Sequence, residues 1–393
     1  MSPDSHTLPA DPWTAREDLA ALVRALGSDK VRWVGGAVRD TLLGHPVADV
    51  DAATLHEPKT VIDLLGSAGI RAIPTGIDHG TVTAILPGGN VEVTTLRHDV
   101  STDGRRATVA FATDWREDAQ RRDFTINALY ADPVTLEIYD WFGGLADLEV
   151  HRVRFIGDAR QRIREDHLRI LRYFRFQARF GSELDQEAEA ACAELAPTLK
   201  GLSRERVAME LLNLLALPDP SATIERMEAR GVLPVVLPEA GDSGVATLRA
   251  LIAEEDRQQV PPDALRRLAA LLPAEPRIAE QVAARLRLSA AQKKRLVTAA
   301  AREAEAGEAR ALAYRLGRNE AVDRLLLTGS DASSLTGWDI PQFPIKGGEI
   351  VARGISAGPE VARILREIEQ RWVEEGFPDS ERAEALLDER LPR

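Results

Sequence analysis

Short runs of β-branched and aromatic residues mark the first third of the chain. Each run is bounded by Gly, Pro, Asn or Asp, which is the pattern of a β-strand between turns. Pro-Gly-Gly-Asn separates the second run from the third and predicts a hairpin with a four-residue loop. A helical period precedes the first run, so we expect mixed α and β structure up to about residue 147. The predicted strands are 31–34, 81–86, 91–96 and 109–112, and the predicted helix is 18–26.

The pattern changes after about residue 159. From there, apolar residues recur at helical spacing in segments rich in Ala, Leu, Arg and Glu, which Pro or Gly interrupts. We therefore expect an α+β fold, with a head of mixed sheet and helices followed by an all-helical neck, body and tail. The expected divisions are a flexible N-terminus at 1–18, the head at 19–150, the neck at 151–215, the body at 216–330 and the tail at 331–393.

Composition limits the class of protein. The chain has 393 residues, 44% hydrophobic and 28% charged, which favours a globular protein of more than one domain. No uncharged apolar run has the length of a membrane span, and the first residues lack the order of a signal peptide. The single cysteine, Cys192, can form no internal disulfide and favours a reducing compartment. We expect a cytoplasmic protein with no membrane partner.

Gly35 and Gly36 join the first predicted strand to a short predicted helix. Glycines let the backbone approach a ligand closely, and a helix N-terminus presents free N–H groups to an anion. A tight structural turn uses the same residues. The turn by itself leaves a phosphate-binding role and a structural role equally open.

Two carboxylates stand at the start of the next apolar run. Positions i and i+2 of a strand project from the same face, so Asp49 and Asp51 can converge on one site. Converging carboxylates repel unless a cation lies between them, and Mg²⁺ binds a few carboxylates together with substrate phosphates. The alternative is a solvated turn before a strand. A third acid, Glu92, lies between two valines of a later predicted strand and is either a site residue or a plain exposed position.

Arg121 and Arg122 precede a short amphipathic segment at 123–129. A guanidinium group matches two phosphate oxygens at once, which suits a triphosphate. The alternative is a pair of solvated surface side chains.

A longer helix is predicted over residues 160–176. Asp166 and Arg169 are three apart on it and would be neighbours on its surface. Cytosine and adenine both present an amine donor beside a ring-nitrogen acceptor, so Asp166 can accept from the amine while Arg169 donates to the nitrogen. Guanine and uracil present the reverse order and would be left unpaired. The alternative is an ordinary ion pair, worth about 0.2–0.5 kcal/mol.

The order of these motifs, from about residue 31 to 210, resembles the class II branch of the DNA polymerase β-like nucleotidyltransferases. That branch comprises CCA-adding enzymes and bacterial poly(A) polymerases. The resemblance implies that Asp49 and Asp51 bind two catalytic Mg²⁺ ions, with Glu92 as a weaker candidate for polarising the RNA 3′-hydroxyl. It also implies nucleotide contacts from Gly35, Gly36, Arg39, Arg121, Arg122, Asp123, Asn127, Glu165, Asp166, Arg169, Arg172 and Arg175.

Three segments resemble CCA-adding enzymes in particular: 75–83, 92–97 and the loop 99–107. In the family this loop helps to switch the site from CTP to ATP. We therefore expect an enzyme that builds the 3′-CCA end of tRNA from CTP and ATP, with Mg²⁺ as cofactor. A poly(A) polymerase or an A-adding enzyme is the alternative with the same chemistry. A non-catalytic RNA-binding protein is the alternative of another class, and the oligomeric state stays open.

The net charge of −12 does not exclude an RNA partner, because net charge averages over all faces of a protein. Residues 152–206 contain twelve Lys and Arg against nine Asp and Glu, so the predicted neck is locally basic. The acidic total predicts weak non-specific RNA binding that salt weakens further.

Overall fold

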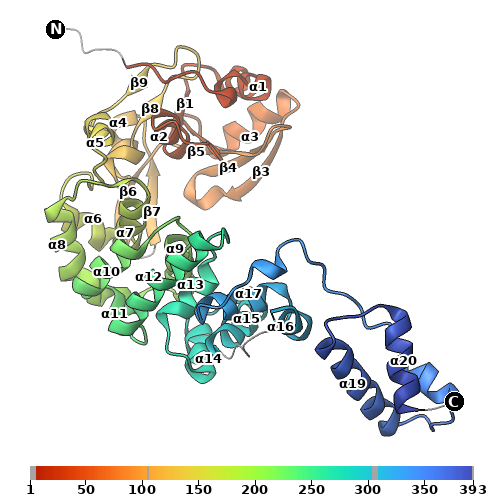
Figure 1. The fold of residues 1–393 in the computed structure, drawn as a ribbon. Coiled ribbons are helices and arrows are strands. Elements are labelled where there is room, and N and C mark those ends of the chain that lie inside the picture. The colour runs from red at the N-terminus through yellow and green to blue at the C-terminus, as the bar shows by residue number, and fades with distance from the viewer. Residues whose placement is uncertain (1–5, 104–105, 303–308, 392–393) are drawn as a thin grey trace. The chain divides into compact units, whose positions relative to one another are not determined.

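The computed structural model describes residues 6–103, 106–302 and 309–391. The chain divides into two compact units. The first, the head-and-neck unit, contains Met1–Leu214 and Ala222–Val236 (Figure 1). The second, the C-terminal unit, contains Leu215–Ser221 and Leu237–Arg393. The finer division of the helical part into body and tail stays a prediction.

A seven-stranded mixed sheet forms the centre of the head, in the order β3-β4-β5-β2-β1-β8-β9. The central strand β2 is parallel to β5 and antiparallel to β1. The parallel register places Asp51 directly opposite Glu92. The strands are β1 (Val31–Val34), β2 (Val50–Thr54), β3 (Arg71–Gly76), β4 (Thr81–Ile85), β5 (Val91–Thr95), β8 (Tyr130–Ala131) and β9 (Ile138–Tyr139). A separate two-stranded sheet pairs β6 (Arg97–Asp103) with β7 (Arg106–Phe111).

The sequence pattern predicts only some of these strands: the run 109–112 overlaps the end of β7, and no predicted run corresponds to β3, β6, β8 or β9. The run 31–34 is β1, and the predicted hairpin is β4 paired antiparallel with β5. Alternation explains the pairing, because Val82, Val91 and Val93 are fully buried while Glu92 between the last two is exposed. The predicted α+β class is confirmed.

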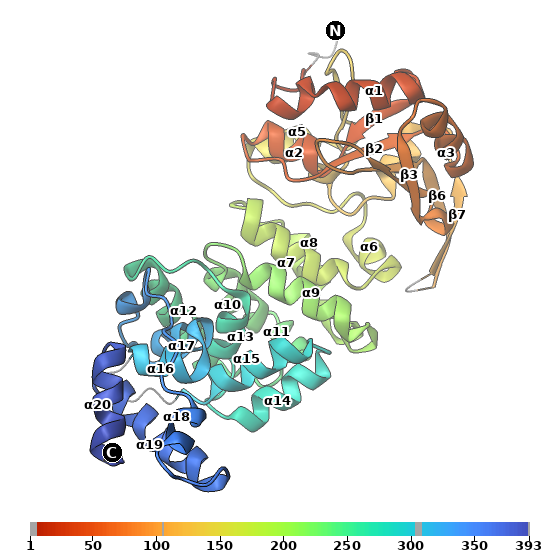
Figure 2. The ribbon, with the colours of Figure 1, turned by 90° about the vertical axis from the view of Figure 1, so that its right-hand side faces the viewer.

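Within the described residues of the head, five α-helices accompany the sheet. Helices α1 and α3 lie side by side, and α3 packs against β3, β4 and β5 (Figure 2). A Cβ atom at Gly144, in α5, would lie 2.4 Å from the carbonyl oxygen of Thr125, so only glycine allows this close approach. The helices are α1 (Glu17–Leu26), α2 (Gly36–Leu42), α3 (Pro58–Ser67), α4 (Trp115–Gln120) and α5 (Gly144–Glu149).

The N-terminal segment differs from the expected flexible lead-in. In its described part, from residue 6, Leu8 and Trp13 are buried in the head. The Trp13 indole N–H donates to the hydroxyl of Thr41, over 2.9 Å, and its ring packs edge-to-face on Trp33. Two apolar side chains among many polar ones anchor the segment, which composition alone does not reveal.

The neck is helical, but the single helix predicted over 160–176 is wrong. Helix α6 ends at Glu165, Asp166 has an extended backbone (φ −150°, ψ 105°), and α7 begins at Arg169. The Asp166 carboxylate accepts the backbone N–H of Leu168, over 3.1 Å. Aspartate breaks a helix in this way because its side chain competes for nearby backbone groups. The neck helices are α6 (Ala159–Glu165), α7 (Arg169–Phe180), α8 (Gln186–Leu195), α9 (Arg204–Leu215), α10 (Ser221–Ala229) and α11 (Leu233–Val236).

The C-terminal unit is helical in its described residues, as expected. One of its apolar clusters contains Ile364, Ile368 and Trp372 from one helix, packed on Leu386 and Leu387 from another. None of the helices in the described ranges has the length and apolar character needed to cross a membrane. The helices are α12 (Asp242–Arg257), α13 (Ala264–Leu271), α14 (Pro276–Arg285), α15 (Ala290–Ala300), α16 (Ala309–Leu316), α17 (Arg318–Leu327), α18 (Gly347–Ala352), α19 (Pro359–Glu374) and α20 (Ser380–Arg390).

Candidate active site

A charged pocket of about 530 Å³ lies within the head-and-neck unit. The β1–α2 turn, the start of β2, the segment after α4 and helix α7 supply its walls. Five arginines and four aspartates line it, so it offers sites for both anions and cations. The lining residues are Gly35, Gly36, Arg39, Asp40, Ala48, Asp49, Asp51, Arg122, Asp123, Asn127, Arg172, Arg175, Phe176 and Arg179.

Most of the residues predicted from the sequence meet at this pocket. Ten of them line it, whereas Glu92, Arg121, Glu165, Asp166 and Arg169 do not. Sequence reasoning missed Asp40, Ala48, Phe176 and Arg179. Two of these had a signal, because Arg179 lies one helical turn beyond Arg175 and Asp40 directly follows Arg39.

The Gly-Gly turn forms one edge of the pocket. Gly35 has a φ of +73°, which is a conformation that favours glycine, and Gly36 begins α2. A Cβ atom at position 35 would lie 3.5 Å from Nη1 of Arg122. The turn therefore brings backbone close to a guanidinium group, and the positive φ rather than a lack of space favours glycine at position 35.

Asp49 and Asp51 form the acidic wall. Asp49 is exposed just before β2, and Asp51 is partly buried within the strand. Burial and the nearby charge of Glu92 raise the pKa of Asp51 to about 6, with a smaller contribution from Asp49 and opposition from Arg122. Carboxylates whose mutual repulsion the protein leaves uncompensated suit a divalent cation.

The donor set is small for a metal site. No group of three or more His, Cys, Asp or Glu side chains in the described residues is arranged to hold a metal ion on its own. Mg²⁺ is commonly bound through one or two carboxylates, with water and substrate phosphates as its other ligands. Asp49 and Asp51 fit that kind of site.

A chain of hydrogen bonds runs along the opposite wall. The Arg39 guanidinium donates to Asp40 through Nε, over 2.8 Å, and to the amide oxygen of Asn127 through Nη1, over 2.5 Å. The amide nitrogen of Asn127 donates to Asp123, over 3.0 Å. At the other end, Asp40 accepts from Arg179, over 3.3 Å. Head and neck side chains thus form one connected network.

The network continues through two acids of the head and neck. Asp123 accepts from Nε and Nη2 of Arg172, over 2.8 and 2.6 Å. Burial alone would raise the pKa of Asp123, but Arg172 and Asn127 hold it well below its usual range. Glu210, 2% exposed in α9, accepts from Nε of Arg175, over 2.6 Å. Nη1 and Nη2 of Arg175 have no partner within the described part of the chain, so they remain available to a ligand.

In the described residues, the side chains of the two residues predicted to read the base form no hydrogen bond or ion pair with each other, although the backbone N–H of Arg169 donates to the carbonyl oxygen of Asp166, over 3.0 Å. Asp166 accepts from Arg206 of α9, over 2.7 Å, and Arg169 donates to Glu165, also over 2.7 Å. Arg169 also donates to the carbonyl oxygens of Arg162 and Arg121, over 3.0 and 3.1 Å. The expected adjacency on one helix face is therefore wrong, because Asp166 is the break between two helices.

Two models of known families match the chain. Residues 31–154 match the poly(A) polymerase head domain, and residues 181–242 match a domain described as "Probable RNA and SrmB- binding site of polymerase A". The mitochondrial CCA tRNA nucleotidyltransferase 1 of Mus musculus is 35% identical over 375 residues, which cover 88% of this chain and 84% of the mouse protein. The chain belongs to the CCA tRNA nucleotidyltransferase family.

Further members of the CCA tRNA nucleotidyltransferase family match this chain in sequence and in structure. The CCA-adding enzyme of Streptococcus sanguinis is 39% identical over 232 residues, 58% of this chain and 56% of that protein. The crystal structure of the Bacillus stearothermophilus CCA-adding enzyme in complex with CTP matches with a TM-score of 0.78 at 26% identity. That match covers 97% of this chain and 98% of the other. The predicted family is confirmed.

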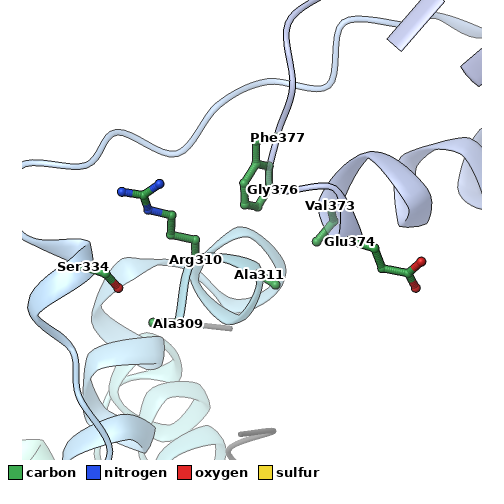
Figure 3. A pocket seen from close by; sticks show the side chains of 8 residues that line it. All are labelled: Ala309, Arg310, Ala311, Ser334, Val373, Glu374, Gly376 and Phe377. Atoms are coloured by element: carbon green, nitrogen blue, oxygen red, sulfur yellow. The ribbon is translucent and has the colours of Figure 1, made fainter. Parts of the chain in front are cut away.

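A second pocket, of about 280 Å³, lies in the C-terminal unit (Figure 3). The exposed Arg310 contributes its single lining cation, and that guanidinium lies 5.6 Å from the centre of the Trp338 ring. Glu374 is its single lining acid. This pocket lacks the paired carboxylates of the first, so we place the family's chemistry in the head. Its lining residues are Ala309, Arg310, Ala311, Ser334, Val373, Glu374, Gly376 and Phe377.

Proposed function

We propose that this enzyme adds or repairs the 3′-terminal CCA of tRNA, using CTP and ATP and releasing pyrophosphate. The observation that carries the proposal is the pocket whose lining includes Asp49, Asp51 and five arginines. The names of the mouse and streptococcal relatives support the same reaction. A cytoplasmic location stays a prediction, because the name of the mouse relative includes "mitochondrial".

The arginine wall would bind the triphosphate. Arg122, Arg172 and Arg175 line the pocket with guanidinium groups, which pair bidentately with phosphate oxygens. The turn at Gly35 and Gly36 would let the backbone come close to the same phosphates. Because the carboxylates of the hydrogen-bonded network already fix the arginines, little side-chain freedom is lost when the nucleotide binds.

Asp49 and Asp51 would hold two Mg²⁺ ions together with the triphosphate. When bound, the ions would lower the pKa of the RNA 3′-hydroxyl and neutralise the leaving pyrophosphate. Glu92 does not line the pocket, but it is exposed on β5 directly opposite Asp51. We propose that Glu92 lies where the RNA 3′ end approaches and that its charge keeps Asp51 ready to exchange a proton for a cation.

Asp166 and Arg169 would select the base. Each carboxylate oxygen of Asp166 accepts one hydrogen bond and has a second lone pair, so it can also accept the amine of cytosine or adenine. Arg206 and Glu165 would each hold one of the two side chains in place through a hydrogen bond. The loop 99–107, expected to assist the change from CTP to ATP, includes residues 104 and 105, which lie outside the described residues.

Labelled CTP and ATP, Mg²⁺ and a tRNA that lacks its CCA end provide the test. The expected product is longer by three nucleotides, and a control tRNA that already ends in CCA should gain none. A long ladder of added A would identify a poly(A) polymerase, and a single added A an A-adding enzyme. RNA binding without any incorporation would refute the proposed activity.

Replacing Asp166 and Arg169 together by Ala tests the selection of the base. The double variant should incorporate GTP and UTP more readily while Mg²⁺ binding persists, because the acidic wall is unchanged. Arg204→Ala is a matched control, since Arg204 lies on α9 near Arg206 and, within the described residues, its side chain donates only to the carbonyl of Lys200. Unaltered discrimination in the double variant would exclude the templating role.

A further inference from the structure

Asp118 is a buried acid that lies outside the pocket. It belongs to α4 and is 1% exposed. One carboxylate oxygen accepts from the backbone N–H of Arg97, over 3.1 Å, and from Nε of Arg121, over 2.8 Å. The other accepts from the hydroxyl of Tyr130, over 2.5 Å, and from Nη2 of Arg122, over 3.3 Å. Each oxygen therefore accepts two hydrogen bonds, and one of the four donors, Arg122, lines the pocket.

Tyr130 completes the arrangement from the neighbouring strand β8. It is fully buried, and its hydroxyl accepts from Nε of Arg122, over 3.0 Å, while donating to Asp118. Burial raises the pKa of Tyr130, so the phenol keeps its proton near neutral pH and remains a donor. The tyrosine thus bridges the buried acid and the pocket arginine.

These contacts leave one end of Arg122 free. Nε and Nη2 are held by Tyr130 and Asp118, whereas Nη1 has no hydrogen-bond partner in the described residues. Nη1 is the atom that lies beside the Gly35 turn, in the wall of the pocket. A guanidinium group held on two of its three nitrogens presents the third in a fixed direction.

We propose that Asp118 and Tyr130 are positioning residues, which hold Arg122 in the orientation that takes a phosphate oxygen of the bound nucleotide. This inference rests on the proposed function, because it takes the triphosphate as the ligand of the pocket. Neither residue touches the nucleotide. Their contribution is to fix Arg122 before the ligand arrives, so that no binding energy is lost in ordering it.

Inorganic tripolyphosphate is a suitable probe, because it carries the phosphate chain and lacks a base and sugar. Its dissociation constant would be measured by calorimetry on the full chain in the presence of Mg²⁺. We expect it to rise about tenfold in Tyr130→Phe, because that is the usual cost of losing a contact that supports a ligand-binding side chain. The affinity for cytidine, which has no phosphate, should not change. A general structural disturbance would weaken both.

Arg122→Ala provides the decisive comparison. Adding Tyr130→Phe to Arg122→Ala should change tripolyphosphate binding by less than about twofold, because the hydroxyl acts only through the arginine. Tyr139→Phe is the matched control, since Tyr139 belongs to the same aromatic cluster and forms no hydrogen bond with Arg122 in the described part of the chain. It should bind tripolyphosphate as the unaltered protein does.

Asp118→Asn makes the same comparison at the second residue that holds Arg122. It replaces Tyr130→Phe if thermal melting shows the Tyr130→Phe protein to be unfolded. The positioning role would be overturned if the altered proteins bound tripolyphosphate as tightly as the unaltered protein. It would also be overturned if the loss of tripolyphosphate affinity were the same with Arg122 as with Arg122→Ala. Because tripolyphosphate binding does not depend on which nucleotides are added, a failed CCA-addition assay alongside the expected binding losses would reject only the proposed reaction.

Discussion

Both units bury arginines against carboxylates, but with opposite results. In the C-terminal unit, Arg267 is 1% exposed, and all its nitrogens are bonded to Glu255 and to backbone carbonyls between 215 and 218. In the head-and-neck unit, Arg122 and Arg175 are bonded on one side only and open on a pocket. A guanidinium group whose donors are all hydrogen-bonded within the protein stabilises the fold. A guanidinium group with free donors beside a cavity can bind a ligand.

The acids differ in the same way. Glu255 and Asp323 of the C-terminal unit each accept from two arginines, so their charges are locally balanced. Burial, together with the like charges of Glu92 and Asp49, raises the pKa of Asp51 in the head against the opposing charge of Arg122. The C-terminal network stabilises its own unit, while the acidic wall of the head carries a local cost that a bound cation would remove.

Asp51→Asn should separate activity from stability most strongly. We expect nucleotide addition to fall about 10³-fold, equivalent to about 4 kcal/mol, because a metal ligand is lost. The folded protein should become about 1 kcal/mol more stable at pH 7, since a carboxylate with a pKa of about 6 is ionised there at a cost. Nucleotide-addition assays and urea unfolding measure the two effects. An active variant, or a less stable one, would contradict the comparison.

Glu255→Gln should lower stability and leave nucleotide binding unchanged. Removing one charge from the buried network leaves Arg266 and Arg267 without their shared partner, so the free energy of unfolding should fall by about 3 kcal/mol. CTP affinity of the folded protein should not change. Urea unfolding and calorimetry are the measurements, and Glu360→Gln, in an exposed ion pair, is the control expected to show no measurable effect. Equal effects of the two changes would show that burial does not matter here.

Asp123→Asn tests the network that supports the arginine wall. Arg172 would lose the nearer of its two ionic partners and keep Glu210, 3.6 Å from Nη1, while Asn127 could still form its hydrogen bond. The affinity for CTP should fall about thirtyfold, or about 2 kcal/mol, with a smaller change in stability. Asp158→Asn, which alters a helix cap of the neck away from the pocket, serves as the control. A loss of stability that exceeds the loss of affinity would make this network equivalent to that of the C-terminal unit.

The smallest expected effect is the dependence of Mg²⁺ binding on pH. The folded pKa of Asp51 is raised to about 6, so protons compete with the cation below that value and the destabilising charge is present only above it. Apparent affinity should fall by up to about tenfold between pH 7 and pH 5. The Mg²⁺-induced rise in melting temperature, followed against pH, measures this. Asp51→Asn should abolish the dependence, and a pH-independent rise in the unaltered protein would refute it.

Local patterns predicted the parts of the fold that local chemistry determines. Alternation located β1 and the β4–β5 hairpin, and the family resemblance carried by the ordered motifs implied ten of the residues that line one pocket. What failed depends on contacts between distant positions. The break at Asp166 is held by Arg206, forty residues away, and Arg179 meets Asp40 across 139 positions. No short window of sequence contains both members of either pair.

The order of strands in the sheet has a consequence during synthesis of the protein. Strand β1 pairs with β2 on one side, but on the other it pairs with β8, whose Tyr130 lies 96 positions after Val34. A growing chain that has not yet extruded residue 131 from the ribosome leaves β1 as an open edge, which invites association with other strands. Because of the same delay, strand β2 with Asp51 emerges long before Tyr130, which orients Arg122. Truncated products ending before β8 should therefore aggregate rather than accumulate as a smaller nucleotide-binding head.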